Sequence, residues 1–174
     1  MIVLVSDTSV LIDLERGGLL EAAFGCGHQL IVPDLLYEVE LASENGPLLK
    51  QLGLLIVELT SEEVAFAQRV RINNTKLSLP DCFALSCARR PEHVLVTGDG
   101  ALRAEAHGNK INCRGLLWLL DQMEQTGIVA AMSLAEGLQK IFAHPRCRLP
   151  KHDVNERLAK WTSAKREARS LKSG

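Results

Sequence analysis

The sequence predicts an α/β protein with a central, mainly parallel β-sheet flanked by helices, followed by a C-terminal helical extension. Short apolar runs of strand length alternate with helical patterns over residues 1–125. Residues that start helices (Asp, Ser, Thr and Pro) follow several of these runs, and residues 126–174 contain no further strand-like run. Strands that alternate with helices favour a parallel sheet with right-handed crossovers. We therefore expect one α/β domain over residues 1–125 and a helical extension over residues 126–174 that packs on this domain.

The first two predicted strands are Met1–Ser6 and Gln29–Val32, both continuous apolar runs with β-branched residues. Asp7 directly follows the first run and can cap the helix that Gly17 interrupts. Pro33 follows the second run, and as a first-turn residue it predicts a helix through LLYEVELAS. The chain therefore begins as two strand–helix units.

Two more strand–helix units follow. Leu54–Leu59 is the next predicted strand, and Thr60 with Glu63 forms a capping signature for the helix after it. Pro80 opens a helix with an apolar face, and His93–Thr97 is strand-like. These elements extend the predicted parallel sheet.

The last part of the chain is mostly helical. Helices are predicted at Ala101–Ala106, Arg114–Gln125 and Ser133–Phe142, with a short edge strand at Ile111–Cys113 and a final helix capped by Asp153. The large apolar residues expected in or near the core of these helices are Trp118, Leu120, Met123 and Trp161.

Composition and charge limit the class of protein. The 174 residues are 47% apolar and 24% charged, as in an ordinary globular domain, and aromatic residues are only 4%. The net charge of −1 is uneven: residues 144–174 carry +6 and the remainder −7. The basic segment fits either a polyanion contact or a solvated chain end. Five cysteines without a C-x-x-C pair indicate reduced thiols. With no signal peptide or membrane span expected, we predict a cytoplasmic protein.

Four acidic residues stand where a parallel sheet would gather them at one edge. Asp7 follows the first strand, Asp99 follows a later strand, and Asp81 lies in the first turn of a helix. Glu38 lies about one turn into the helix after the second strand. Functional groups collect beyond the carboxyl ends of such strands, so we expect the four carboxylates to face one pocket. Each alone also fits a structural role, as an N-cap or a solvated helix residue.

Carboxylates crowded at one edge predict a divalent cation, because like charges raise one another's pKa unless a cation compensates. Hard oxygen ligands suit Mg²⁺ or Mn²⁺, and no His or Cys cluster has zinc spacing. The hydroxyls of Ser9 and Thr97 are expected to orient the ligands, whereas Asp13 and Glu40 are expected to face solvent. Arg103, one helical turn past the last acid, is a candidate contact for a phosphate of a nucleic-acid substrate. The pattern predicts metal-dependent hydrolysis of a phosphodiester.

Four sequence blocks occur in a characteristic order: DTSVLIDL, PDLLYE, LPDCFALSCA and VTGDGAL. Together they resemble the PIN domain, and most closely the VapC-type toxins of bacteria and archaea, over roughly residues 1–125. The resemblance implies a PIN-like three-layer fold, Mg²⁺ or Mn²⁺ at the acidic site, and endoribonuclease activity on single-stranded RNA. It also implies a homodimer and a cognate antitoxin protein.

The resemblance also implies roles for individual residues. The family's four acids, catalytic and metal-binding, fall on Asp7, Glu38, Asp81 and Asp99. Its polar helper positions fall on Ser9 and Thr97. Asp7 and Asp99 are expected to bind the metal directly, Asp81 directly or through water, and Glu38 as a ligand or as a base that orients water.

Other functions remain open. The extension after residue 125 is longer than in the shortest toxins, and PIN domains also serve in RNA processing, so a PIN-type RNA-processing nuclease without a toxin role is an alternative. A non-catalytic module that binds RNA or protein would be expected to lack an acid, yet all four are present. A phosphotransfer domain of the haloacid-dehalogenase type needs a second Asp where Ser9 stands, and a receiver domain needs an acidic pair before its first helix. A purely structural domain does not account for the set of acids.

Overall fold

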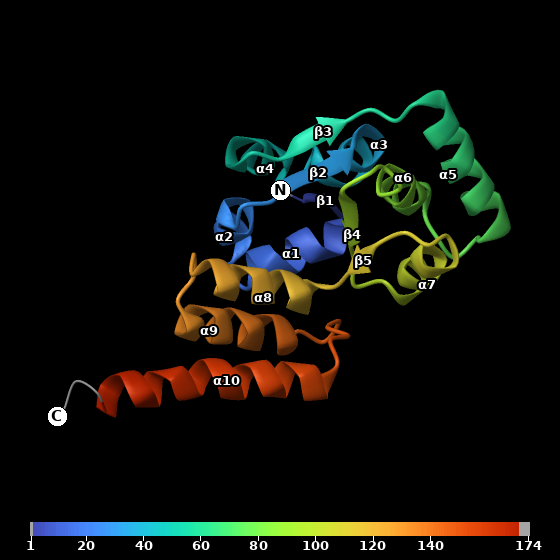
Figure 1. The fold of residues 1–174 in the computed structure, drawn as a ribbon. Coiled ribbons are helices and arrows are strands. Elements are labelled where there is room, and N and C mark those ends of the chain that lie inside the picture. The colour runs from blue at the N-terminus through green and yellow to red at the C-terminus, as the bar shows by residue number, and fades with distance from the viewer. Residues whose placement is uncertain (1, 171–174) are drawn as a thin grey trace. The chain divides into compact units, whose positions relative to one another are not determined.

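The structure, a computed structural model, describes residues 2–170 and the side chains of residues 2–163. In this part of the chain an all-parallel sheet is flanked by helices and has the strand order β3-β2-β1-β4-β5 (Figure 1). The strands are β1 (Val3–Ser6), β2 (Gln29–Pro33), β3 (Leu55–Val57), β4 (His93–Val96) and β5 (Cys113–Arg114). The predicted α/β class with a mainly parallel sheet is confirmed.

Helices connect the strands and form the C-terminal part of the chain. They are α1 (Thr8–Arg16), α2 (Leu20–Gly25), α3 (Asp34–Leu36), the π-helical segment η1 (Tyr37–Leu41), α4 (Gly46–Leu52), α5 (Ser61–Asn73), α6 (Leu79–Cys87), α7 (Gly100–Gly108), α8 (Leu116–Thr126), α9 (Ala131–Phe142) and α10 (Lys151–Ser170). Helix α4 was not predicted from the sequence. That helix ends at Gly53, whose φ of 108° is a left-handed conformation that favours glycine.

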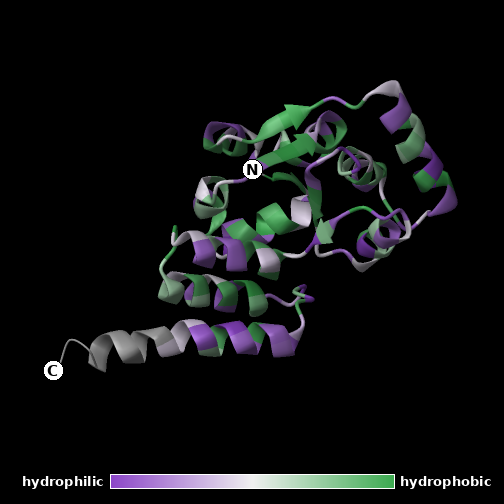
Figure 2. Ribbon diagram, viewed as in Figure 1, coloured by the Kyte–Doolittle hydropathy of each residue, from purple (hydrophilic) through white to green (hydrophobic). Residues whose placement is uncertain are grey.

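The centre of the sheet is β1, which pairs with β2 on one side and β4 on the other. Leu4 and Val5 are almost completely buried, because both faces of a central parallel strand are covered. The register pairs Ser6 with Val96, so β1 and β4 end at the same level. Figure 2 shows the strands as hydrophobic, as expected for a covered parallel sheet. This register places the residues that follow β1 and β4 beside each other.

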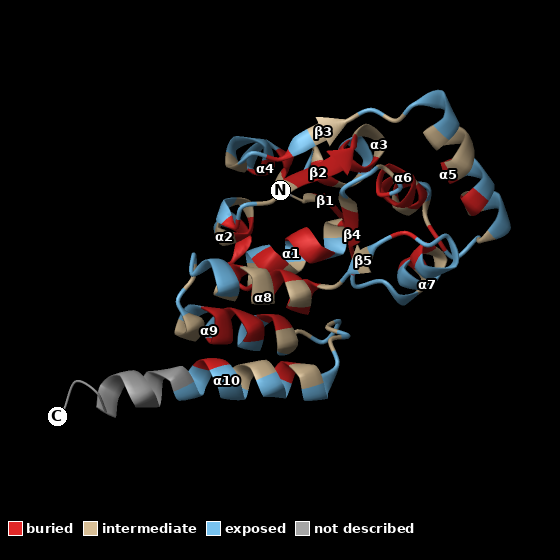
Figure 3. Ribbon diagram, in the orientation of Figure 1, coloured by how far each residue is buried: buried red, intermediate tan, exposed pale blue. Residues whose placement is uncertain are grey.

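Helix α6 packs against β1, β2 and β4, and it is buried over most of its length (Figure 3). Cys82, Ala84 and Cys87 have no exposed surface, and their small side chains allow close packing of the helix on the sheet. The helix begins with a capping box in which Ser78 and Asp81 satisfy each other's backbone N–H groups. Packing and capping together fix the position of Asp81 at the start of α6.

Contacts divide the chain into two compact units, which we describe separately. The first comprises Met1–Leu11 and Gly27–Leu116 and contains the sheet; the second comprises Ile12–Cys26 and Leu117–Gly174 and is helical. The prediction of a domain boundary near residue 125 stays a prediction. None of the helices in the described part of the chain is long and apolar enough to cross a membrane.

Within the second unit, α9 and α10 pack on each other. Leu120, Met123 and Trp161 are buried as predicted, whereas Trp118 is only half-buried. Two ion pairs connect α10 to α8: Arg157 with Asp121 at 2.6 Å and Lys160 with Glu124 at 2.7 Å. These pairs assign two of the basic side chains of the extension to packing within the unit. Four others, Lys165, Arg166, Arg169 and Lys172, lie outside the described side chains.

Candidate active site

The site lies where β1 and β4 end. The backbone N–H of Asp7, directly after β1, donates to the carbonyl of Val96 at 3.2 Å, and the N–H of Thr97 donates to the carbonyl of Arg114 at 3.0 Å. Residues 7 and 97 are therefore neighbours although 90 positions separate them. The adjacent ends of parallel strands form the crevice in which α/β proteins place their functional groups.

Asp7 is the buried centre of the site, with only 4% of its surface exposed. One carboxylate oxygen, Oδ1, accepts from the Ser9 hydroxyl at 2.8 Å and from the backbone N–H of Val10 at 3.0 Å. The other, Oδ2, accepts from the Thr97 hydroxyl. Ser9 and Thr97 therefore make the contacts that the sequence predicts for residues that orient a ligand.

Burial dominates the electrostatics of Asp7. Desolvation raises the pKa of this carboxyl, and the hydrogen bonds from Thr97, Val10 and Ser9 lower it only in part. The negative charge of Asp81 adds a smaller upward contribution. A raised carboxyl pKa is what the sequence predicts for the metal-free site, but burial contributes more to it than crowding does. Ionised Asp7 is consequently a costly charge that a bound cation would stabilise.

Asp99 and Asp81 stand at the starts of helices that reach the same edge. Asp99 caps α7 by accepting from the N–H of Leu102 at 2.7 Å, and its own N–H donates to the Thr97 hydroxyl at 3.0 Å. Asp81 accepts from the N–H and the hydroxyl of Ser78, both through Oδ2. In the described hydrogen bonds, Asp81 and Asp99 each use a single carboxylate oxygen. The capping role and a ligand role are therefore compatible for both residues.

Glu38 and Glu40 are arranged differently from the expectation that Glu38 faces the site and Glu40 faces solvent. Glu38 is exposed, and none of its described contacts joins it to Asp7, so its role stays a prediction. Glu40 is half-buried and accepts a hydrogen bond from the hydroxyl of Thr8, the residue next to Asp7. Glu40 is therefore the acid of this helix that contacts the site, and its expected position in solvent is wrong.

Both glutamates lie in the π-helical segment η1. A π-helical turn closes i→i+5 hydrogen bonds, so side chains after it face other directions than in an α-helix. Sequence periodicity gives no warning of such a turn. Ser78 was not predicted as a functional residue, although the spacing S-x-x-D from Ser78 to Asp81 is a capping signature that the sequence contains.

Arg103 lies at the rim of the site, on α7. Its Nη1 donates to the carbonyl oxygen of Thr97 at 3.2 Å, and its side chain is exposed. A Cβ atom at residue 115 would lie 3.1 Å from this nitrogen, so Gly115 leaves the room that the guanidinium occupies. The structure thus places a cation beside Thr97, the residue that contacts both Asp7 and Asp99.

The residues present fit a hydrated divalent cation better than a fully protein-coordinated one. Among the described residues, no group of three or more His, Cys, Asp or Glu side chains is arranged to hold a metal directly. Mg²⁺ retains several waters and uses one or two carboxylates, and buried Asp7 with its two neighbouring aspartates offers that kind of donor set. The cation-binding role of these residues remains an expectation.

Comparison with protein families then decides the family. A family model described as a PIN domain matches residues 3–163, which is most of the chain. The chain belongs to the PIN domain family. PIN domains are in general nucleases, and so hydrolases, that typically use divalent metals. No curated protein and no solved structure matches this PIN domain. The match extends beyond residue 125 and so includes α9 and much of α10.

Proposed function

We propose that this PIN domain is a metal-dependent endoribonuclease that hydrolyses phosphodiester bonds of single-stranded RNA with Mg²⁺ or Mn²⁺. The observation that carries the proposal is the surroundings of Asp7: a buried carboxylate held by hydroxyl and amide donors, with Asp81 close enough to raise its pKa and no described basic partner. Such a group is expensive to ionise without a cation and well oriented to bind one.

The residues expected to hold the cation are Asp7 and Asp99 directly, and Asp81 directly or through water. Glu38 is the fourth expected residue, and Glu40, which contacts Thr8, is an alternative to it. When bound, Mg²⁺ or Mn²⁺ activates water and stabilises the negative charge that develops on the leaving oxygen. The contribution of the chain itself is to orient the carboxylates. The hydroxyls of Thr97 and Ser9 hold Asp7, and the capping bonds to Ser78 and Leu102 hold Asp81 and Asp99.

The deciding experiment is cleavage of a labelled single-stranded RNA with Mg²⁺, Mn²⁺ or EDTA. We expect cleavage with either metal, none with EDTA, and a loss of about 10³-fold or more in Asp7→Asn, comparable to the loss of other central catalytic groups. Glu62→Gln, which removes an exposed carboxylate of α5, is the matched control and should retain cleavage. Retained cleavage in an Asp7→Asn, Asp99→Asn double variant would contradict the assignment.

The toxin role, the antitoxin protein and the homodimer belong to the same proposal and rest on the VapC-like sequence blocks alone. We expect expression of the wild-type chain to arrest growth, and Asp7→Asn to relieve the arrest. Cleavage without growth arrest would favour an RNA-processing nuclease. RNA binding without cleavage would favour a non-catalytic PIN module.

A further inference from the structure

Two adjoining cavities lie along α7 and β5, outside the cluster of carboxylates. The first, about 180 Å³, and the second, about 280 Å³, share the lining residues Ile111 and Asn112, so they adjoin, and we refer to them together as the groove. The first is lined in addition by Arg103, His107, Cys113 and Arg114. The second is lined in addition by Ala88, Arg89, Arg90, His93, Asn109 and Lys110.

The groove begins beside the candidate active site, at Arg103, whose guanidinium contacts the carbonyl of Thr97. Helix α7 starts directly after Asp99 and contacts β5. Its nine residues span about 14 Å at 1.5 Å per residue, and Lys110 follows its end. The second cavity therefore lies near the start of β4, at His93, whereas the first reaches Arg114 at the end of β5. This path is long enough for more than one phosphate of a nucleic acid.

The groove is lined by positive charge, whereas residues 1–143 as a whole carry a net negative charge. Residues 1–143 carry 18 acids and 11 bases, yet the described lining of the two cavities includes no acid and five of those bases. One of the five, Arg90, is already neutralised by Glu63, to which it donates two hydrogen bonds. The other four bases, Arg89, Arg103, Lys110 and Arg114, remain to attract an anion.

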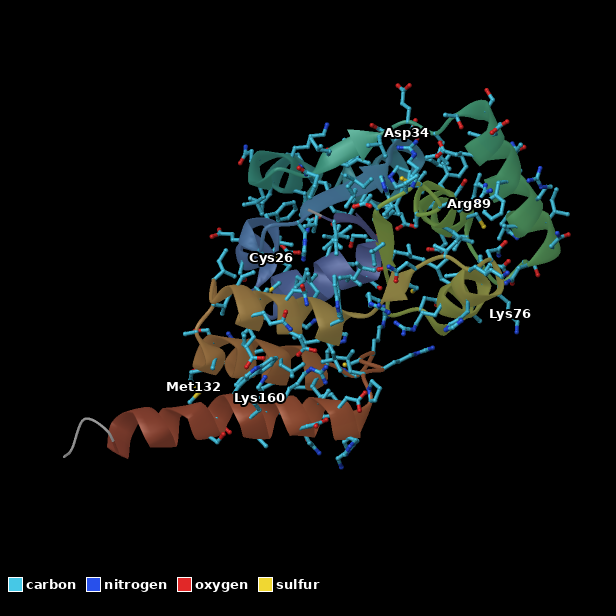
Figure 4. The ribbon with its side chains drawn as sticks, viewed as in Figure 1. Cys26, Asp34, Lys76, Arg89, Met132 and Lys160 are labelled. Carbon is cyan, nitrogen blue, oxygen red and sulfur yellow. The ribbon has the colours of Figure 1, made fainter. Side chains whose placement is uncertain are left out.

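Local contacts hold two of these cations in place. The carbonyl of Thr97 accepts from Arg103, and Gly115 leaves space for its guanidinium. At the far end the guanidinium of Arg89, labelled in Figure 4, lies 4.1 Å from the centre of the Phe66 ring. A guanidinium held by a carbonyl or by a ring keeps its charge and loses less entropy when it binds a phosphate.

We propose that this groove binds the phosphodiester backbone of single-stranded RNA on one side of the scissile bond. The inference rests on the proposed nuclease function, which supplies the polyanion. The described lining contains no Phe, Tyr or Trp on which bases could stack. Recognition in the groove is therefore electrostatic and independent of sequence.

The test is RNA affinity at several salt concentrations in the Asp7→Asn background, with EDTA, so that cleavage does not intervene. One variant removes the cations near the site, Arg103→Gln with Arg114→Gln. A second removes those at the far end, Arg89→Gln with Lys110→Gln. The control is Arg69→Gln with Lys76→Gln, two bases of the same unit that line neither cavity. Thermal unfolding of each variant verifies that the fold is retained.

We expect both groove variants to bind more weakly, and the slope of log affinity against log salt to fall by about 0.7 for each lost phosphate contact. The control should match the parent. Equal behaviour of the far-end variant and the control would overturn the proposal. So would competition by a poly-glutamate peptide as effective as RNA of equal charge, because the groove would then suit an acidic protein partner.

A cleavage assay on the wild-type chain, which retains Asp7, distinguishes this inference from the proposed function. Cleavage together with unaltered binding in both groove variants would refute the groove and leave the nuclease. No cleavage together with weaker binding in both variants would refute the nuclease and support the groove.

Discussion

Two carboxylates of the same unit, Asp7 and Glu63, show how their surroundings separate a functional acid from a structural one. Glu63, at the start of α5, receives two hydrogen bonds from the guanidinium of Arg90, at 2.7 and 2.8 Å. These bonds are the largest cause that lowers the pKa of Glu63, to about 2. Asp7 is more deeply buried and receives hydrogen bonds only from hydroxyl and amide groups, so burial raises its pKa.

These two carboxylates show that hydrogen bonds from neutral groups orient a carboxylate but do not replace a positive charge. Neutral donors offset part of the cost of burying an ion, whereas a guanidinium compensates the charge itself. At Glu63 the chain provides that cation. At Asp7 the described neighbours provide none, and Asp81 adds negative charge. A site of this kind is suited to a cation from solution.

Removal of the charge of Glu63 should have the largest effect on stability. Glu63→Gln leaves Arg90 without its partner, so we expect a loss of about 1.5–3 kcal/mol in the free energy of unfolding, as for hydrogen bonds to charged groups. Urea unfolding at neutral pH measures it. Glu62→Gln, a neighbouring exposed acid, is the control. An unchanged free energy of unfolding in Glu63→Gln would mean that the ion pair does not hold α5 to the segment that follows α6.

Removal of the Thr97 hydroxyl should affect catalysis more than folding. Thr97→Val keeps the shape of the side chain but deletes the donor to Asp7 and the acceptor from the Asp99 N–H. We expect cleavage and Mn²⁺ affinity to fall by about 10–100-fold, as for residues that orient metal ligands. Thr97→Ser, which retains the hydroxyl, should recover most of the activity. Equal activity of the Val and Ser variants would refute an orienting role.

In the metal-free protein, Asp7→Asn should raise the stability of the fold, whereas Glu63→Gln should lower it. The folded pKa of Asp7 is raised, so its contribution to stability is complete below the unfolded value of about 3.8 and is lost as the pH rises through the raised folded value. Asparagine carries no charge to desolvate, and we expect the variant to unfold at a higher temperature at neutral pH.

The two acids should also differ in their pH windows. The contribution of Glu63 is present above its ordinary pKa of 4.5 and is lost as the pH falls towards about 2. Thermal unfolding with EDTA from pH 2 to pH 8 should therefore show the Glu63→Gln deficit vanishing in acid and the Asp7→Asn gain appearing as pH rises. A deficit in Asp7→Asn at every pH would mean that its hydrogen bonds outweigh the cost of its charge.

The smallest expected effect is at Gly115. In Gly115→Ala the new Cβ would lie 3.1 Å from Arg103 Nη1, at the end of a flexible side chain that can shift. We expect stability to change little and the salt slope of RNA binding to fall by no more than about 0.7, the contribution of one phosphate contact. Gly108→Ala, where no atom lies within 4 Å of the added Cβ, is the matched control.

The sequence alone determined the features that depend on short stretches of chain. Apolar runs of strand length predicted the strands, because a covered parallel strand is apolar on both faces. The Thr60–Glu63 capping signature predicted the start of α5, and Pro80 as a first-turn residue predicted the start of α6, because both signals act within one helical turn. The family followed from the order of four local blocks, and the family match over residues 3–163 confirms the PIN domain.

Only the tertiary structure decided what depends on distant residues. The partnership of Asp7 with Thr97 arises from the pairing of β1 with β4, across 90 positions of sequence. Glu40 contacts Thr8, whereas Glu38 in the same π-helical segment is exposed, and the local sequence did not distinguish the two. The basic groove exists because α7 returns along β5 and carries Arg103 to the side of Arg114. Local sequence encodes which elements form and where they start, whereas strand pairing and helix packing decide which side chains meet, because those contacts join residues far apart in the chain.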